Sequence, residues 1–372
     1  MIDIKKNGWC PFYNKAFLAK DGYLLRITPN KSSLSYDKAV HLCKLSLSMG
    51  NGLMDLTNRG NIQIRGIKKL DIEKLSKELL EKEITVENDK VKIIISPFWF
   101  RDDDNINFSN IISSKSYYFP KSPDKFSIAI DLGTQPVLRD VFSDIRLEKT
   151  DQGENILYVD GSNLGRIINE KNIISYIFEL LELYNDSIRK YKYIKRMSCI
   201  VKHSLLPKKW MEIPVVKSSK IKFSNLKRFG GSYIAKYGRI DATLFLDFLK
   251  IARPTNIRFT PFKTFIFENN NNVEHRAFAI ADNNYKIKVY SCPGSISCSS
   301  STINTHELAD RLNDLRYNKI HISGCKKGCA FSKPAELTLV GNNGLIDVIF
   351  NGKASDKPNF SSLTDKELLN NL

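Results

Sequence analysis

The feature that most limits the fold of this chain is a group of four cysteines in its last quarter: Cys292, Cys298, Cys325 and Cys329. They form a C-x5-C…C-x3-C pattern, so each of two short turns carries two thiols. Structural zinc sites favour closer C-x2–4-C pairs around one ion. An iron–sulfur cluster is wider and needs four soft thiolates from looser loops. Glycines in both turns let the backbone approach sulfur closely. The pattern therefore favours an iron–sulfur cluster.

Zinc, disulfides and ordinary core packing are the alternatives for these cysteines, and the cluster is favoured over all three. The chain has seven cysteines, an odd number, and thiolate ligation suits a reducing compartment better than disulfides do. Residues 1–8 lack the apolar segment of a secretory signal. The longest strongly apolar run, residues 93–100, is far too short to cross a bilayer. We therefore expect a cytoplasmic protein that does not enter the membrane.

The charge of the chain is strongly positive, with 57 Lys and Arg against 40 Asp and Glu and a net charge of +17. Such an excess suits nucleic acid, a membrane surface or a polyanionic small molecule. Many lysines look like compositional drift, however, and the basic stretch at 189–196 is typical of a helix end, where the dipole favours cations. Charge alone thus does not establish nucleic-acid binding, and a nucleic-acid partner is not expected.

A β-α-β element occurs twice along the chain. With 372 residues and 42% hydrophobic content, the chain should divide into two or more units. The first copy has a strand at 23–27, a helix at 35–48 and a strand pair within 53–67. The second copy has a strand at 236–240, a helix at 243–252 and a returning strand at 256–268. This repeat sets Arg239 against Arg26, and residues 258–263 against residues 55–60.

The other periodic segments alternate between helix and strand. We expect helices at 71–83 and 172–191, and strands at 90–97 and 125–131. A helix capped by Thr305 should follow the first cysteine turn. An Asn-Asn-Gly turn at 342–344 predicts a hairpin between strands 335–341 and 345–352. The sequence therefore predicts an α+β chain of about four modules.

Together the cysteine pattern, the repeated β-α-β and the segment DLTNRGNIQ at 55–63 resemble the nitrite/sulfite reductase superfamily. Within it, three segments resemble the precorrin-3B synthase family. They are Cys10-Pro11 leading to DGYLLR at 21–26, PDKFS at 123–127, and SGCKKGCA at 323–330. The resemblance covers residues 8 to about 355.

The resemblance implies an architecture of duplicated ferredoxin-like half-domains with two reductase-type 4Fe-4S modules around a tetrapyrrole cleft. On this division the first half-domain is 1–72, the first α/β module is 73–215, the second half-domain is 216–272, and the cluster-binding module is 273–372. In the reductases the tetrapyrrole is sirohaem, and the cysteine that matches Cys329 bridges the cluster and the haem iron.

For the precorrin-3B synthase family, the resemblance implies that the tetrapyrrole is the substrate, precorrin-3A. It is hydroxylated at C20 with lactone formation, using O₂ and reducing equivalents from a donor such as NADH or a reductase. The implied cofactors are a [4Fe-4S] cluster and a mononuclear non-haem iron. None of the five histidines has a metal-binding spacing, so the sequence names no ligand for that iron.

A tetrapyrrole carries carboxylates around an apolar disc, so its site needs fixed cations, and arginine binds a carboxylate with two parallel hydrogen bonds. Arg59 and Lys125 match catalytic positions of the superfamily. The expected substrate-binding residues are Arg26, Thr57, Asn61, Gln63, Arg239 and Arg258.

Two departures separate the subfamilies. Sulfite reductases have a second lysine two residues after the first, where this chain has Ser127, and the chain is shorter than expected for those reductases. Both differences favour the precorrin enzyme. A sirohaem-dependent sulfite or nitrite reductase is the alternative.

Overall fold

The computed structural model describes residues 11–86, 91–123, 126–133, 135–215, 229–270, 273–281, 287–312 and 315–371. Two residues that the sequence singles out, Cys10 and Lys125, lie outside this set. The described residues of 1–28, 35–84 and 230–372 form one compact unit, and those of 29–34 and 85–229 form a second. No helix in the described part of the chain is both long enough and apolar enough to span a bilayer.

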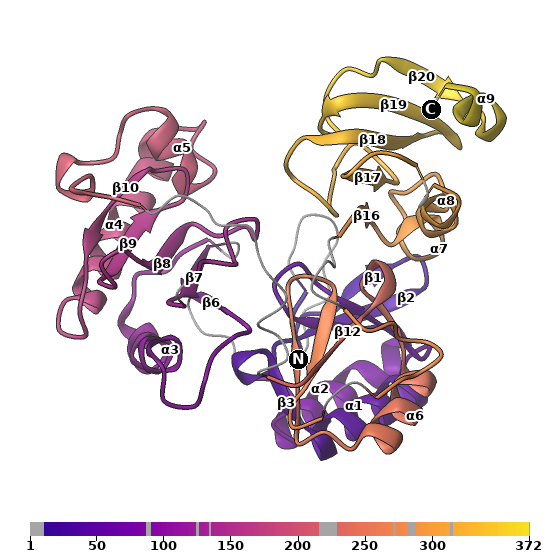
Figure 1. Cartoon of the computed structure of the whole chain (residues 1–372), viewed down its shortest axis with the longest axis horizontal. Helices are drawn as coiled ribbons and strands as arrows, with labels where there is room; N and C mark the ends of the chain where they lie inside the picture. The colour runs from indigo at the N-terminus through magenta and orange to yellow at the C-terminus, as the bar shows by residue number, and fades with distance from the viewer. Residues whose placement is uncertain are drawn as a thin grey trace. The chain divides into compact units, whose positions relative to one another are not determined.

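The first unit contains a five-stranded sheet with the order β1-β2-β5-β4-β13. Helices α1, α2 and α6 gather on one face of this sheet (Figure 1). Side chains of Ser35 and Asp241 cap the first turns of α1 and α6, as expected for these residue types. The elements are β1 (Phe17–Ala19), β2 (Gly22–Ile27), α1 (Tyr36–Met49), β4 (Leu53–Leu56), β5 (Ile62–Ile67), α2 (Ile72–Glu81), β13 (Arg239–Asp241) and α6 (Ala242–Ala252). Strand β3 (Ser33–Ser35) precedes α1.

The strands of this sheet alternate between an apolar and a polar face. Leu25, Met54 and Ile64 are buried under the helices. Gln63 and Arg65, one residue to either side of Ile64, point to the opposite face. That face carries polar side chains on β5 and apolar ones such as Phe17 and Leu24 on β1 and β2, and it is where the candidate site lies.

One strand of the second copy of the repeat joins the sheet of the first copy. The other strands of the second copy pair in the order β12-β15-β14, which matches β2-β5-β4 of the first copy. The strand that precedes α6, β13, instead pairs antiparallel with β4 of the first copy. A connection in the other direction is made by Tyr36 N–H, which donates to Thr255 O at 3.2 Å. The strands are β12 (Gly231–Ile234), β14 (Asn256–Phe259) and β15 (Thr264–Phe267).

This topology corrects one expectation from the sequence. The counterpart of β2, which carries Arg26, is β12 and not the strand that carries Arg239. The sequence does not predict β12 as a strand because it begins with glycine, which is a poor strand former. The returning strand expected at 256–268 is the pair β14 and β15.

The turns that close the two copies are equivalent, as the sequence repeat predicts. Thr57 N–H donates to Asn61 O at 2.8 Å, and Thr260 N–H donates to Thr264 O at 3.0 Å. Each turn then needs a left-handed residue, which is Gly60 in the first copy (φ 72°) and Lys263 in the second (φ 58°). The ammonium group of the half-buried Lys263 donates to Leu56 O of the first copy at 2.5 Å.

The C-terminal module, residues 287–371, has a sheet with the order β16-β17-β18-β19-β20. Ile320 and Ile322 on β17 pack with Leu308 of α8 in its core. The predicted hairpin is confirmed, because β18 ends at Asn342 and β19 begins at Leu345. The elements are β16 (Val289–Ser291), α7 (Gly294–Ser297), α8 (Thr305–Arg311), β17 (Ile320–Ser323), β18 (Ala335–Asn342), β19 (Leu345–Gly352), β20 (Phe360–Leu363) and α9 (Asp365–Asn371).

The second unit has a six-stranded sheet with the order β11-β10-β9-β8-β7-β6. Its apolar side chains form a core with residues of α3, α4 and α5. In this sheet β6, β7 and β8 are parallel to one another, and β9 is antiparallel to β8. The C-terminal module has the same pattern, because β16, β17 and β18 are parallel and β19 is antiparallel to β18. The elements are β6 (Lys92–Ile95), α3 (Asp104–Lys115), β7 (Ser127–Asp131), β8 (Ile145–Lys149), β9 (Asn155–Val159), β10 (Leu164–Ile167), α4 (Ile173–Lys190), α5 (Met197–Lys202) and β11 (Ile213–Pro214).

The two similar sheets hold different loops. Ser96 N–H donates to Ile130 O at 2.8 Å after β6, and Cys292 N–H donates to Ile322 O at 3.2 Å after β16. Ser96 thus occupies the position of Cys292. In the second unit the loop after β7 is held by Arg146, which donates to Leu138 O at 3.0 Å and Val141 O at 2.6 Å.

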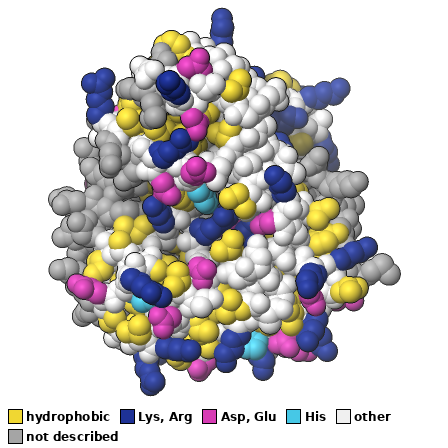
Figure 2. Space-filling model, turned by 90° about the vertical axis from the view of Figure 1, so that its right-hand side faces the viewer, with side chains coloured by type: hydrophobic (Ala, Val, Ile, Leu, Met, Phe, Trp, Pro, Cys, Tyr) yellow, Lys and Arg dark blue, Asp and Glu magenta, His cyan; other side chains and the backbone are white. Residues whose placement is uncertain are grey.

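The positive charge of the chain is dispersed on the face shown in Figure 2. There the Lys and Arg side chains are interspersed with Asp and Glu, and they do not merge into one basic surface. This distribution fits the view that many lysines are solvated surface residues.

The half-buried Lys263 makes the stability of the fold depend on pH. Burial lowers its pKa from 10.5 to about 8, although Asp55 acts in the opposite direction. Between these values the unfolded chain keeps a proton that the folded chain has lost, so the wild type gains stability as pH rises. Relative to a K263M variant, we expect a gain of up to about 3 kcal/mol between about pH 7.5 and pH 10.

Urea unfolding of both proteins at the two pH values measures this gain. The matched control is K250M, which removes an exposed lysine from α6 and should track the wild type at both pH values. A stability difference between wild type and K263M that stays constant with pH would contradict the expectation.

Candidate functional site

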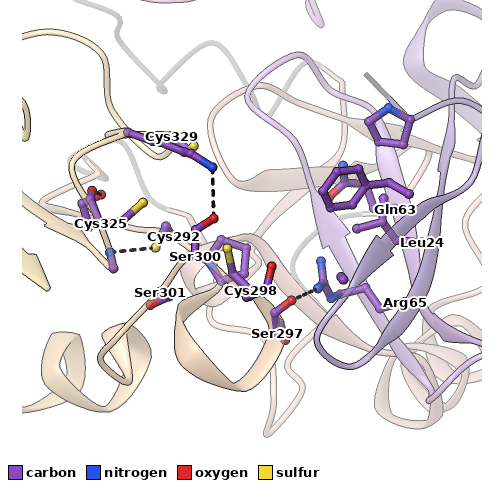
Figure 3. A pocket seen from close by; sticks show the side chains of 18 residues that line it. Leu24, Gln63, Arg65, Cys292, Ser297, Cys298, Ser300, Ser301, Cys325 and Cys329 are labelled. Atoms are coloured by element: carbon purple, nitrogen blue, oxygen red, sulfur yellow. Dashed lines mark hydrogen bonds between the residues drawn. The ribbon is translucent and has the colours of Figure 1, made fainter. Parts of the chain in front are cut away.

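A pocket of about 280 Å³ in the first unit is lined by the two cysteine turns and by the polar face of the ferredoxin-like sheet (Figure 3). All four motif cysteines line it, so the structure brings together residues that lie up to 37 positions apart (Cys292 to Cys329). The lining residues that the sheet contributes are Phe17, Ala19, Leu24, Gln63 and Arg65. The pocket thus has sulfur on one side and a mixed apolar and cationic wall on the other.

The first cysteine turn is fixed by Thr305. Cys292 follows β16 directly, and Cys298 follows the single helical turn α7. The predicted cap role of Thr305 is wrong, because the Asn304 side chain accepts the N–H of Glu307 instead. Thr305 Oγ1 donates to Cys292 O at 2.6 Å. Gly294 (φ 71°) must be glycine here, since a Cβ would lie 2.7 Å from Thr305 Oγ1.

The second cysteine turn follows β17 and is joined to the first. Gly324 N–H donates to Cys292 Sγ at 3.2 Å, and Lys327 Nζ donates to Ser300 Oγ at 3.0 Å. The turns approach so closely that a Cβ on Gly324 would lie 1.8 Å from Ser301 Oγ. The two turns are therefore held together as one cysteine frame by hydrogen bonds and close packing.

The thiols influence one another across the pocket. Burial, and then the nearness of Cys325, Cys292 and Cys298, raises the pKa of Cys329. Burial also raises the pKa of Cys292, against the N–H groups of Gly324 and Gly294. No disulfide joins any of the described cysteines. Four free thiols around one pocket, with N–H groups directed at the sulfur of Cys292, fit an iron–sulfur cluster, which these cysteines would hold.

The thiols surround the pocket and do not gather at one point. Among the described residues, no three His, Cys, Asp or Glu side chains are grouped closely enough to hold a single metal ion. The described part of the chain therefore shows neither a preformed zinc site nor a ligand set for a mononuclear iron.

A row of polar side chains crosses the sheet beside the pocket. In register, Arg26 lies opposite Gln63, Gln63 lies opposite Asp55, and Asp55 lies opposite Arg239. Residues directly opposite one another share a face of the sheet. The structure thus brings together Arg26, Gln63 and Arg239, which the sequence singled out, and adds the carboxylate of Asp55.

Arg65 makes several charge-assisted hydrogen bonds on this face of the sheet. Its side chain is 3% exposed. Its guanidinium donates to both carboxylate oxygens of Asp21 at 2.8 Å, to Asp55 Oδ2 at 3.2 Å and to Ser297 O at 2.8 Å. Asp55 also accepts from Arg239 Nε at 3.0 Å. Burial alone would raise the pKa of Asp55, but Arg239 and Arg65 hold it below its usual value.

The segment 57–61 is a turn that touches the second cysteine loop. The hydroxyl of Thr57 accepts the N–H groups of Arg59 and Asn61, so it holds the turn together. Asn58 Nδ2 donates to Ala330 O at 3.0 Å, next to Cys329. Arg59 is half-buried in this turn. Asn58 therefore links this turn to the second cysteine loop.

The remaining expected site residues lie elsewhere. Arg258 on β14 is buried and forms an ion pair with Glu268. Of the expected substrate-binding residues, Gln63 lines the pocket, whereas the pocket lining does not include Arg26, Thr57, Asn61, Arg239 or Arg258. The expected catalytic residue Arg59 is also not among the lining residues. Lys125 lies outside the described residues, and Ser127, two positions later, is buried in β7 of the second unit.

Sequence reasoning missed Asp21, Asp55, Asn58 and Arg65. Arg65 could have been found, because it lies two residues after Gln63 on the same strand and so on the same face.

The comparisons with known proteins agree with the fold. The sequence model of the nitrite/sulfite reductase ferredoxin-like half domain matches residues 18–82. The structure of the NirA protein of Mycobacterium tuberculosis superposes with a TM-score of 0.59 at 16% identity, over 88% of this chain and 74% of that chain. The chain thus has an α+β fold of the nitrite/sulfite reductase class.

A relative that aligns over nearly the whole chain gives a more specific similarity within this fold class. The chain is 25% identical to a precorrin-3B synthase from Sinorhizobium sp over 403 aligned positions, covering 97% of this chain and 86% of the relative. It is therefore a homologue of precorrin-3B synthase.

Steric contact between the turns gives a test of the cysteine frame. The backbone of Gly324 suits any residue, but the Cβ of a G324A variant would meet Ser301 Oγ at 1.8 Å and its Cβ at 2.4 Å. We expect the turns to separate at a cost of about 1–3 kcal/mol. Iron and sulfide bound per chain after reconstitution should fall sharply. The double variant G324A/S301G removes the clashing atoms and should recover binding, whereas wild-type loading of G324A alone would contradict this account.

Proposed function

We propose that this chain is a precorrin-3B synthase-type monooxygenase of aerobic cobalamin biosynthesis. In this proposal it hydroxylates precorrin-3A at C20 with lactone formation. The observation that carries the proposal is the single pocket lined by all four motif cysteines and by the polar sheet face. The full-length similarity to a precorrin-3B synthase supports the choice of substrate.

The proposed reaction balances with one O₂ and one two-electron donor. One oxygen atom enters the product as the hydroxyl group at C20. The other leaves as water after taking two electrons from the donor, such as NADH or a reductase, and two protons, of which NADH would supply one and the solvent the other. The product is therefore heavier than the substrate by one oxygen atom.

The residues of the chain have distinct parts in this proposal. Cys292, Cys298, Cys325 and Cys329 would hold a [4Fe-4S] cluster, which supplies or stores electrons when bound. Phe17 and Leu24 present an apolar wall that suits a macrocycle. Arg26 and Arg59 would bind its carboxylates, because a guanidinium matches a carboxylate with two hydrogen bonds. Gln63 would add a neutral hydrogen bond from the same sheet face.

The proposed division into two half-domains and two modules rests on the repeated topology. The order β2-β5-β4 recurs as β12-β15-β14, and the pattern of β6 to β9 recurs in β16 to β19. We place the boundaries near residues 72, 215 and 272.

Turnover with labelled oxygen tests the activity. Reconstituted protein is incubated with precorrin-3A, a reductant and ¹⁸O₂, and the product is analysed by mass spectrometry. We expect a product that gains one labelled oxygen atom. Unchanged substrate in a sample whose cluster is intact would count against the proposal.

The alternative is a sirohaem-dependent sulfite or nitrite reductase, and the match of residues 18–82 to the half-domain model is compatible with it. The visible spectrum of the purified protein separates the two functions. A tightly bound haem gives strong, sharp bands, whereas a cluster alone gives broad absorption. Haem bands together with sulfite reduction would favour the reductase.

Single cysteine replacements test the metal site without relying on turnover. We expect C298A and C325A each to lose most of the bound iron and sulfide, because a cluster needs all four thiolates for stable ligation. The matched control is C199A on α5, whose thiol lies outside the pocket lining and which should load like the wild type. Full cluster content in both C298A and C325A would remove these cysteines from the ligand set.

A further inference from the structure

One cysteine turn is anchored to the ferredoxin-like sheet through a buried arginine. We propose that Arg65 is a positioning residue for Cys298, which it places by holding the preceding residue, Ser297. Arg65 Nη2 donates to Ser297 O at 2.8 Å, and Ser297 is itself buried. This inference deepens the proposed function and rests on it for its consequence, because Cys298 is one of the proposed cluster ligands.

Arg65 joins three segments that are distant in sequence. Its acceptors are Asp21 in the turn between β1 and β2, Asp55 on β4, and Ser297 at the end of α7. A planar guanidinium offers five N–H donors in a fixed geometry, so it can serve three acceptors at once. A lysine is a point charge and cannot reproduce that arrangement.

A second arginine completes the same anchor, which we call the Arg65 clamp: Asp21, Asp55, Arg65, Arg239 and Ser297. Arg239 Nη2 lies 3.3 Å from Ser297 Oγ, while its Nε donates to Asp55. Two cations and two carboxylates balance, so the clamp can be buried without a net charge. Ser297 is held at both its carbonyl and its hydroxyl oxygen.

The first cysteine turn depends on such an outside contact. Helix α7 has four residues, and a single helical turn is not stable on its own. Cys298 N–H donates to Gly294 O at 2.9 Å, a bond within the same turn. The hydrogen bonds from Arg65 and Arg239 tie this turn to the rigid sheet. Their loss should free Cys298 while leaving the second turn in place.

Thiol alkylation of the cluster-free protein tests the clamp independently of any cofactor. The folded chain is treated with a maleimide, and the rate at each cysteine is read by peptide mass spectrometry. In an R65Q variant we expect Cys298 to react about tenfold faster relative to Cys325, as loss of a charge-assisted hydrogen bond implies. The matched control is R146Q, since Arg146 is also buried and also holds a loop by its carbonyls, in the second unit.

Two outcomes would overturn the proposal. One is an unchanged Cys298 to Cys325 ratio in R65Q. The other is an equal rise at all cysteines in both R65Q and R146Q, which would indicate general loosening. If R65Q does not fold, R239Q provides the test, because the Arg239 side chain is 18% exposed and removing it leaves the Arg65 bonds in place. R239Q should raise the same ratio by a smaller factor, and no rise would also overturn the proposal.

Reconstitution with iron and sulfide separates this inference from the proposed function. In R65Q, mild oxidation should convert a larger share of the clusters to a three-iron form than in wild type or R146Q, measured by electron paramagnetic resonance. An equal share in R65Q and wild type would contradict the clamp. If the wild type binds no cluster, the proposed function fails, while the alkylation ratio still decides whether Arg65 positions Cys298.

Discussion

The buried guanidinium of Arg65 is the interaction on which the arrangement of the site depends. A buried charge is tolerated only where its hydrogen bonds are satisfied, and removing one partner of a buried ion pair costs about 3–5 kcal/mol. Arg65 satisfies this condition with acceptors from the first half-domain and from the first cysteine turn. The sheet and the cysteine turn are therefore stabilised together, and a change in one displaces the other.

The sequence predicts the positions of helices and strands in this fold better than it predicts which strands pair with one another. The hairpin after residue 342 and the helices α1, α4 and α6 follow from turn chemistry and apolar spacing. The exchange of β13 into the first sheet does not, because strand pairing is a long-range property that the periodicity of one strand does not report. The misplaced counterpart of Arg26 has a local cause instead, because the glycine-rich start of β12 (Gly231–Ile234) gives no strand signal.

The candidate site shows the same limit. The four cysteines are predicted as ligands from their spacing alone, and the structure brings them to one pocket. Arg65 is not predicted, because its bond to Ser297 spans 232 residues and leaves no local pattern. The two similar sheets add a further contrast: Cys292 in one occupies the position of Ser96 in the other. The same arrangement of strands thus carries a loop with thiols in the C-terminal module and a loop held by buried Arg146 in the second unit.

The exchanged strand also sets the smallest part of this chain that can exist alone. Residues 18–82 match a domain model, yet their sheet ends at β4, and its outer edge is covered by β13 from beyond residue 238. Expressed separately, that segment would expose an unpaired strand edge and leave the carboxylate of Asp55 without Arg239. The segment that matches the half-domain model is therefore smaller than the unit that folds, which needs a strand from each copy.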